Sequence, residues 1–410
     1  MVFDGNNTDN VGDAQECDIV IVGAGTIGLY IAARLLRDDP KVKICIVESG
    51  DATPKIQSNL ENSKSIGQMH NGTLTGRYSG LGGSSSNWGG QLAEFEQADF
   101  ERPNLKWPIS YEEMKSYYKD VYSFMGFRNI QSNECLDQIF SSEVNGENKI
   151  ENYYTVRLKS KDSIFCTYFK KEIESDSLKI LLNTTATSIC FDNKIAKELI
   201  CTTSSERNIS LKADKFIFAS GTLGINQFFL STQAIHDVPW KSNDYIGKYF
   251  QDHLGGIVGR LKIQDEKKFR KSFEKRIVDG IKIERKLKFQ SKYREHMESG
   301  VVVFFKYQSK DQVYIKKFRS FIRNLSENFN LKDIAGFFNH VYKVKSYLFP
   351  FATKLIFKRQ IHEAFDSNGV LVFVQSEQVP IEESCITISK EEQLKNGLFK
   401  IHVNWDWLGK

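Results

Sequence analysis

The chain has 410 residues and a mass of 47.1 kDa, which is more than one compact core holds and therefore predicts two domains. With 40% hydrophobic and 26% charged residues, it has the composition of a globular protein. Its net charge of +5 is mild. Such a balance suits an anionic cofactor and does not indicate a nucleic-acid-binding protein.

Residues 1–16 are polar and acidic, and they lack the basic and apolar regions of a secretory signal, so we expect a disordered tail. No run of about 18 apolar residues is present to span a bilayer. The seven cysteines are scattered without a CxxC spacing, so no metal site is expected. Cys17 and Cys45 are expected to be small buried apolar groups. A reducing, cytoplasmic location is the simplest expectation.

The first hydrophobic run, at 18–22 (DIVIV), is followed by a glycine loop at 23–28 (GAGTIG). Apolar β-branched residues without alternation predict a strand buried on both faces. Residues 29–36 (LYIAARLL) then predict a helix. Strand, GxGxxG and helix together form a dinucleotide-binding fingerprint. The candidate cofactor-binding residues in this loop are Gly23, Gly25, Thr26, Ile27 and Gly28.

Glycine is expected at each of the three positions of the fingerprint for a different physical reason. Gly23 permits a tight turn, Gly25 lets backbone approach a pyrophosphate, and Gly28 lets the helix pack closely on the strand. A second strand at 42–47 ends at Glu48, 20 residues after Gly28, where an acid is expected to meet a ribose hydroxyl. The alternative is a glycine turn without a ligand, which leaves the register of the three glycines and the acid unexplained.

A second glycine-rich stretch, at 77–90 (RYSGLGGSSSNWGG), cannot form a good helix or a packed strand. It offers backbone N–H groups and hydroxyls, which are the donors of an anion-binding nest. A flexible linker is the alternative, although linkers seldom carry a large aromatic residue such as Trp88. We therefore predict a second cofactor-contacting loop, with candidate residues Gly83, Ser84, Ser85, Asn87 and Trp88.

Both glycine loops together resemble those of the glucose–methanol–choline (GMC) oxidoreductases, which are FAD enzymes that oxidise alcohols and sugars. Three further stretches are similar to motifs of that family, in the family's order: 107–114 (WPISYEEM), 216–224 (FIFASGTLG) and 246–253 (IGKYFQDH). The resemblance implies an α/β fold. We expect a Rossmann-type FAD-binding domain at 17–110 and 178–255, and an α+β substrate domain, built on an antiparallel sheet, at 111–177 and 256–410.

Two of these motifs also have a plain physical interpretation. Ser110 followed by Glu113 forms a capping box, which predicts a helix start at 110 whatever the family. Residues 216–219 predict a buried strand, and the Ser220-Gly221 turn is then placed at its carboxyl end, where open parallel sheets bind ligands. Residues 178–190 are β-rich, and the resemblance implies that backbone near Ala186 contacts the adenine.

The pair Asn87-Trp88 departs from most of the family. Many members have Asn at the position of Trp88, whereas the pyranose oxidase and bacterial sugar dehydrogenase branch is the closest in this loop. In the pyranose oxidases a His-Trp pair occupies these positions, and that histidine holds the flavin covalently. An amide side chain cannot form this link, so we expect non-covalent FAD, with Asn87 near the isoalloxazine ring.

After residue 256 the chain becomes rich in lysine, arginine and aromatic residues. The basic run at 266–276 is interpreted as a solvated helix face, with a membrane surface or an acidic partner as the alternative. Residues 341–358 mix aromatics and lysines and are too short to span a bilayer. They are compatible with a peripheral membrane contact, a channel lining or a substrate entrance. Strands are expected at 370–375, 385–389 and 400–405.

The resemblance implies a catalytic base on a histidine-bearing segment that matches nothing in this sequence. The similarity covers roughly the first three-quarters of the family's length, so we expect a truncated product, a part of a split gene or a piece of a longer protein. A base would take the carbinol proton while the hydride moves to flavin N5. His253 is interpreted as structural and His70 as a surface residue. No catalytic residue is assigned.

Three hypotheses follow. The first is a FAD-dependent dehydrogenase or oxidase of a small alcohol or sugar, with an unknown electron acceptor and with its base outside this chain. The second is an FAD-binding remnant or regulatory module without turnover, or one half of a split enzyme. The third, an NAD(P)-linked dehydrogenase, is disfavoured by the serine–glycine loop, which nicotinamide enzymes do not require.

Overall fold

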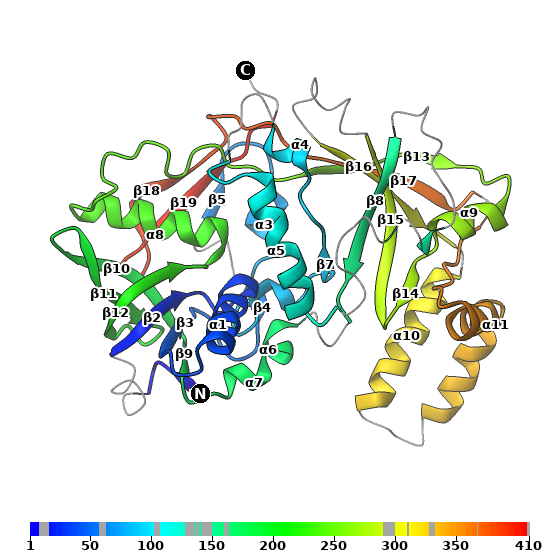
Figure 1. Ribbon diagram of the computed structural model, residues 1–410, viewed down its shortest axis with the longest axis horizontal. Helices are drawn as coiled ribbons and strands as arrows, with labels where there is room; N and C mark the ends of the chain where they lie inside the picture. The colour runs from blue at the N-terminus through cyan, green and yellow to red at the C-terminus, as the bar shows by residue number, and fades with distance from the viewer. Residues whose placement is uncertain are drawn as a thin grey trace. The chain divides into compact units, whose positions relative to one another are not determined.

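The computed structural model describes residues 1–7, 16–56, 63–101, 107–127, 136, 139–140, 150–159, 164–289, 300–309, 311–327, 333–366 and 368–407. The chain forms two compact units, whose elements are labelled in Figure 1. Unit 1 comprises residues 1–90, 160–251 and 379–410, and unit 2 comprises residues 91–159 and 252–378. The fold class is thus α/β with a second, sheet-rich α+β unit, as expected.

Unit 1 is built on a seven-stranded sheet. Its strands are β1 (Val2–Asp4), β2 (Glu16–Val22), β3 (Ile44–Val47), β9 (Leu178–Leu182), β10 (Thr184–Asp192), β11 (Ile195–Thr203) and β12 (Asn208–Phe218). The order across the sheet is β1-β9-β3-β2-β12-β11-β10. In this order, β1, β9, β3, β2 and β12 are parallel to one another. Strands β11 and β10 extend the sheet next to β12 and pair in antiparallel fashion. A crossover helix, α1 (Thr26–Asp38), joins β2 to β3.

The predicted strands and helix around the first glycine loop are confirmed, with β3 two residues shorter than expected. The last four residues of β2 are all buried, which explains their unbroken apolar run. Helix α1 buries an apolar face of Leu29, Ala32, Ala33 and Leu36, at the spacing of a helix with one face on a core.

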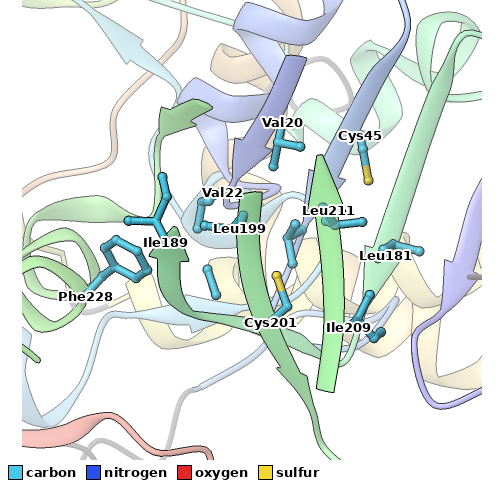
Figure 2. Packing of buried hydrophobic residues seen from close by; sticks show 12 residues of the cluster. Val20, Val22, Cys45, Leu181, Ile189, Leu199, Cys201, Ile209, Leu211 and Phe228 are labelled. Carbon is cyan, nitrogen blue, oxygen red and sulfur yellow. The ribbon is translucent and has the colours of Figure 1, made fainter. Parts of the chain in front are cut away.

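A core cluster of unit 1 collects side chains from all the central strands and from helix α8 (Gly221–Ile235), as Figure 2 shows. Cys45 and Cys201 lie in it, and burial raises the pKa of both thiols, so they pack there as neutral apolar groups. Cys17 is partly buried, and burial raises the pKa of its thiol to about 11. These thiols are structural, as expected for Cys17 and Cys45.

The C-terminal strands β18 (Cys385–Gln393) and β19 (Phe399–Asn404) form a small sheet with β5 (Ser63–Ser65). Their buried residues pack against Leu223 of α8 and against Phe250. Residues 379–410 therefore belong to unit 1, whereas all of 256–410 was expected in the substrate domain. The strands were expected, but their alternation does not reveal the partner with which they pair.

The N-terminal residues also differ from the expected tail. β1 pairs with β9 in parallel, and the ammonium group of Met1 donates a hydrogen bond to the carbonyl of Ile173 at 3.0 Å. Residues 8–15 of the expected tail lie outside the described residues. The described residues of unit 1 also form the short elements β4 (Lys55–Ile56), α3 (Asn71–Leu74), β6 (Tyr78–Ser79), η3 (Gly83–Ser86), α6 (Phe165–Tyr168) and α7 (Lys170–Ile173).

Unit 2 is organised around an antiparallel sheet, as the resemblance implied. Its strands are β7 (Gln91–Leu92), β8 (Ile150–Arg157), β13 (Leu254–Leu261), β14 (Arg276–Val278), β15 (Ile281–Phe289), β16 (Val301–Tyr307) and β17 (Val370–Ser376). Their order is β13-β17-β16-β15-β8-β7, with β14 paired to β15. The helices of unit 2 are α4 (Gln97–Phe100), α5 (Tyr111–Phe124), α9 (Glu266–Phe273), α10 (Gln312–Glu327) and α11 (Asp333–Lys358).

Two helices of unit 2, α5 and α9, were expected from the sequence. Ser110 precedes α5, and its side chain accepts a hydrogen bond from the Glu113 N–H at 3.2 Å, so the predicted helix start is confirmed. The helix expected at 266–276 is α9, which ends at Phe273, and its basic residues Lys267, Lys268 and Lys271 are exposed as interpreted. Phe269 and Phe273 of α9 pack against Phe305, with ring centroids at 5.4 Å and 4.7 Å. Helix α9 is therefore amphipathic and docks on the sheet.

The buried carboxylate of Glu274, directly after α9, connects α9 with α11. Glu274 is 1% exposed and accepts charged hydrogen bonds from Arg270 at 2.6 Å and from Lys354 of α11 at 2.7 Å. His362 lies 3.3 Å from the same carboxylate. Burial alone would raise the pKa of Glu274, but the hydrogen bonds from His362, Lys354 and Arg270 lower it to about 2.

We expect the substitution Glu274→Gln to destabilise the protein by about 3 kcal/mol at neutral pH, because it leaves buried cations without their anion. The carboxylate has an ordinary pKa of 4.5, so its stabilising effect is complete above that pH and is lost as the pH falls toward 2. Urea unfolding across that range measures both effects. Glu266→Gln is the matched control, since Glu266 also contacts Arg270 but is 61% exposed. Equal unfolding midpoints for the two variants would contradict the prediction.

Candidate cofactor-binding site

Four parallel strands of unit 1 end at the same edge of the sheet. Val22 of β2 is in register with Phe218 of β12 and with Val47 of β3, and Val47 is in register with Leu181 of β9. Open parallel sheets bind ligands outside the carboxyl ends of their strands. The first glycine loop, the Ser220-Gly221 turn and Glu48 all follow directly from these strand ends.

The glycines of the first loop differ in what surrounds them. Gly23 has φ +106°, and a Cβ there would lie 2.8 Å from the Ala219 carbonyl oxygen, so the turn requires glycine. A Cβ at Gly28 would lie 1.9 Å from the Gly23 carbonyl oxygen, which shows how closely α1 packs on the loop. At Gly25 a Cβ would meet nothing within 4 Å. The space next to Gly25, where a pyrophosphate is predicted to approach the loop, therefore contains no protein atoms within 4 Å.

Two helices begin at this edge without a side-chain cap. Helix α1 has Gly25 as its N-cap, and α8 has Ser220, and neither has an acidic residue in its first turn. The first N–H groups of such helices carry a partial positive charge that favours an anion. Gly221 also has open space at its Cβ position. Thr26 is half-buried and Ile27 is 59% exposed in the first turn of α1.

The two predicted glycine loops are in direct backbone contact. The Gly82 N–H donates to the Ala24 carbonyl at 2.9 Å. Gly83 has φ +50°, and a Cβ there would lie 2.9 Å from the Cα of Gly25. The structure thus brings together two loops that are separated by 48 residues in the sequence.

Glu48 joins these loops and is 7% exposed. Its Oε2 accepts from the Ala24 N–H at 2.8 Å. Its Oε1 accepts from the N–H groups of Gly50 and Gly80, both at 2.9 Å, and from the Ser79 hydroxyl at 3.1 Å. Most of the carboxylate's acceptor positions are therefore used by the protein itself. A ribose hydroxyl would have to share Oε2.

Glu48 also borders the strand expected to meet the adenine. Its carbonyl accepts from the N–H of Thr184, the first residue of β10, at 2.9 Å. Ala186 follows two residues later and is 5% exposed in the core cluster. The side chain of Ala186 is thus committed to packing in the core.

The serine loop divides into anchors and exposed groups. Ser85 is 1% exposed, and its hydroxyl donates to the Gly82 carbonyl at 2.6 Å and accepts from the Phe165 N–H at 3.1 Å. Trp88 packs edge-on against Phe165 with ring centroids 5.5 Å apart. Ser84 and Asn87 are exposed. Ser79, Gly80 and Phe165 were not among the predicted site residues; Gly80 lies in the same glycine-rich run, whereas no local signal marks Phe165.

Two of the described histidines, His70 and His253, are held by neighbouring side chains. His70, expected at the surface, is 5% exposed, and its ring packs edge-on against Phe250 and Trp405. That expectation was wrong because the packing partners are distant in sequence. His253 lies 2.9 Å from Asp252, and this hydrogen bond raises the pKa of the imidazole. In the described part of the chain, no three His, Cys, Asp or Glu residues converge as a metal would require.

No protein-family model matches the sequence, and no curated protein matches it. Among solved structures, a fungal aryl-alcohol oxidase is similar over 62% of this chain and 55% of its own length, with 14% identity and a TM-score of 0.42. A pyridoxine 4-oxidase from Mesorbium loti matches over 93% and 75%, with 14% identity and a TM-score of 0.49. A formate oxidase from Aspergillus oryzae matches over 95% and 77%, with 15% identity and a TM-score of 0.45.

Proposed function

We propose that this chain is a GMC-type flavoprotein that binds FAD non-covalently and oxidises the CH–OH group of a small alcohol or sugar. The observation that carries the proposal is the open space before Gly25, at the uncapped start of α1, with a second glycine loop packed beside it. An extended anionic group such as a pyrophosphate suits this arrangement, because backbone N–H groups and two helix N-termini face it.

The residues at the sheet edge fit FAD in four respects. The helix starts at Gly25 and Ser220 would hold the pyrophosphate, and Glu48 Oε2 retains an acceptor position for a ribose hydroxyl. Backbone near Ala186 would meet the adenine. The exposed side chains of Ser84 and Asn87 are available to the rest of the cofactor. Asn87 has no group that forms a covalent flavin bond, which supports non-covalent binding at this position.

Bound FAD supplies a hydride acceptor at flavin N5. The chain's own contribution is to bind and orient the cofactor through backbone donors that folding has already aligned. A carbinol must also lose a proton, and we assign no described residue to that step. An FAD-binding module without turnover, or one half of a split enzyme, is therefore the second candidate. The six described cysteines are free, which fits the proposed cytoplasmic location.

The absorbance spectrum of the purified chain, before and after acid precipitation, tests the proposal. We expect flavin bands in the native protein and free flavin in the supernatant after precipitation. Flavin that pellets with the protein would contradict non-covalent binding, and the absence of flavin bands after addition of FAD would contradict the cofactor. Bleaching by members of an alcohol and sugar panel would establish turnover, whereas a bound flavin that no member bleaches would favour the module without turnover.

A further inference from the structure

Helix α11 of unit 2 has apolar residues on two opposite faces. One face is explained by packing, since Val344 and Tyr347 are buried in a cluster with Ile315 of α10. The two helices lie side by side in Figure 1. Phe351 continues this face at the spacing of two helical turns.

The opposite face carries a second line of apolar side chains, which are exposed. Tyr342, Phe349 and Ile356 follow one another at intervals of seven residues, so they form one stripe along the helix. They are 68%, 74% and 64% exposed. The neighbouring Phe357 is 79% exposed. A row of exposed apolar side chains of this kind, interrupted by the small polar residues Ser346 and Thr353, marks an interaction surface.

The charges around the stripe have a single sign. From residue 334 to residue 362 the sequence has no Asp or Glu and has five basic residues: Lys343, Lys345, Lys354, Lys358 and Arg359. Lys354 contacts Glu274, and the other four are exposed. The ammonium group of Lys345 lies 4.2 Å from the centre of the Tyr342 ring, on the stripe itself.

We propose that this stripe docks on the surface of an anionic lipid bilayer. Exposed aromatic and aliphatic residues enter the boundary between headgroups and acyl chains, and flanking lysines and arginines contact the headgroups. Among the described residues, no helix is long and apolar enough to cross a membrane, so the contact is peripheral. A second copy of the chain fits less well, because its basic residues would face those of the first.

Sedimentation with vesicles tests the proposal on the whole chain. We expect binding to vesicles of equal parts phosphatidylcholine and phosphatidylserine, about tenfold weaker binding to phosphatidylcholine alone, and weakening by salt. The double variant Phe349→Ser, Ile356→Ser is expected to bind at least about tenfold more weakly. Ile195→Ser is the matched control, because Ile195 is 58% exposed in unit 1. Thermal melting confirms that all variants are folded.

The proposal is overturned if the native chain does not sediment with anionic vesicles, or if the double variant sediments as well as the native chain. Light scattering in the absence of lipid tests the alternative occupant, a second copy of the chain. A dimer that the double variant abolishes would assign the stripe to a second copy and not to a bilayer. None of these readouts depends on FAD, so they stand apart from the proposed oxidoreductase function.

Discussion

The variant Gly25→Ala is expected to lose tight FAD binding while its fold and melting temperature stay those of the native chain. Gly25 has φ −82°, which alanine adopts without strain, and the new methyl group would meet no protein atom within 4 Å. It would occupy the space through which an anion reaches the first N–H groups of α1. Losing one such charged hydrogen bond costs about 1.5–3 kcal/mol, or roughly 10–100-fold in affinity.

Two other glycines make this experiment specific. Gly28→Ala places a methyl group 1.9 Å from the Gly23 carbonyl oxygen, so it is expected to lower the melting temperature before any ligand is added. Gly256→Ala on β13 is the neutral control, because its Cβ position is also open. FAD titration by flavin fluorescence and thermal melting are measured for all three. Native FAD affinity in Gly25→Ala would place the pyrophosphate somewhere other than this loop.

The features that sequence alone predicted are those determined by local backbone sterics. A glycine at 23 or 28 is required by contacts within the strand–loop–helix unit, so the spacing of a few residues carries the information. The start of α5 depends on Ser110 and the N–H of Glu113, three residues apart. Such local signals can be recognised without knowledge of the rest of the fold. The sheet edge and both loops could therefore be predicted.

The features that sequence did not predict depend on contacts between distant segments. The pairing of β19 with β5 moves the C-terminal strands into unit 1, and alternation within a strand does not specify its neighbour. His70 is buried because Phe250 and Trp405 enclose it. The Ser85 hydroxyl, expected to face a cofactor, is used by the Phe165 N–H. Each of these requires the tertiary structure.

Glu48 shows the same difference between a local signal and a contact between distant segments, because it has two candidate roles: ribose ligand and hydrogen-bond acceptor for the two loops. Its distance from the last glycine predicted a ribose contact, yet the carboxylate mainly accepts hydrogen bonds from the two loops. We therefore expect Glu48→Ala to destabilise the FAD-free chain by about 3–6 kcal/mol, since buried N–H groups of Ala24 and Gly80 lose their acceptor at about 1–3 kcal/mol each, with a further loss at Gly50. This is a large part of a typical domain's stability.

Urea unfolding in the absence of FAD measures this effect without a contribution from ligand binding. Glu48→Gln keeps the shape of the side chain but turns an NH₂ group toward N–H donors, so an intermediate loss of stability is expected. Glu392→Gln is the control, because Glu392 is 51% exposed and pairs with Lys400 at the surface. If Glu48→Gln unfolds with the native midpoint and loses only FAD affinity, the carboxylate is a ribose ligand and does not hold the loops together.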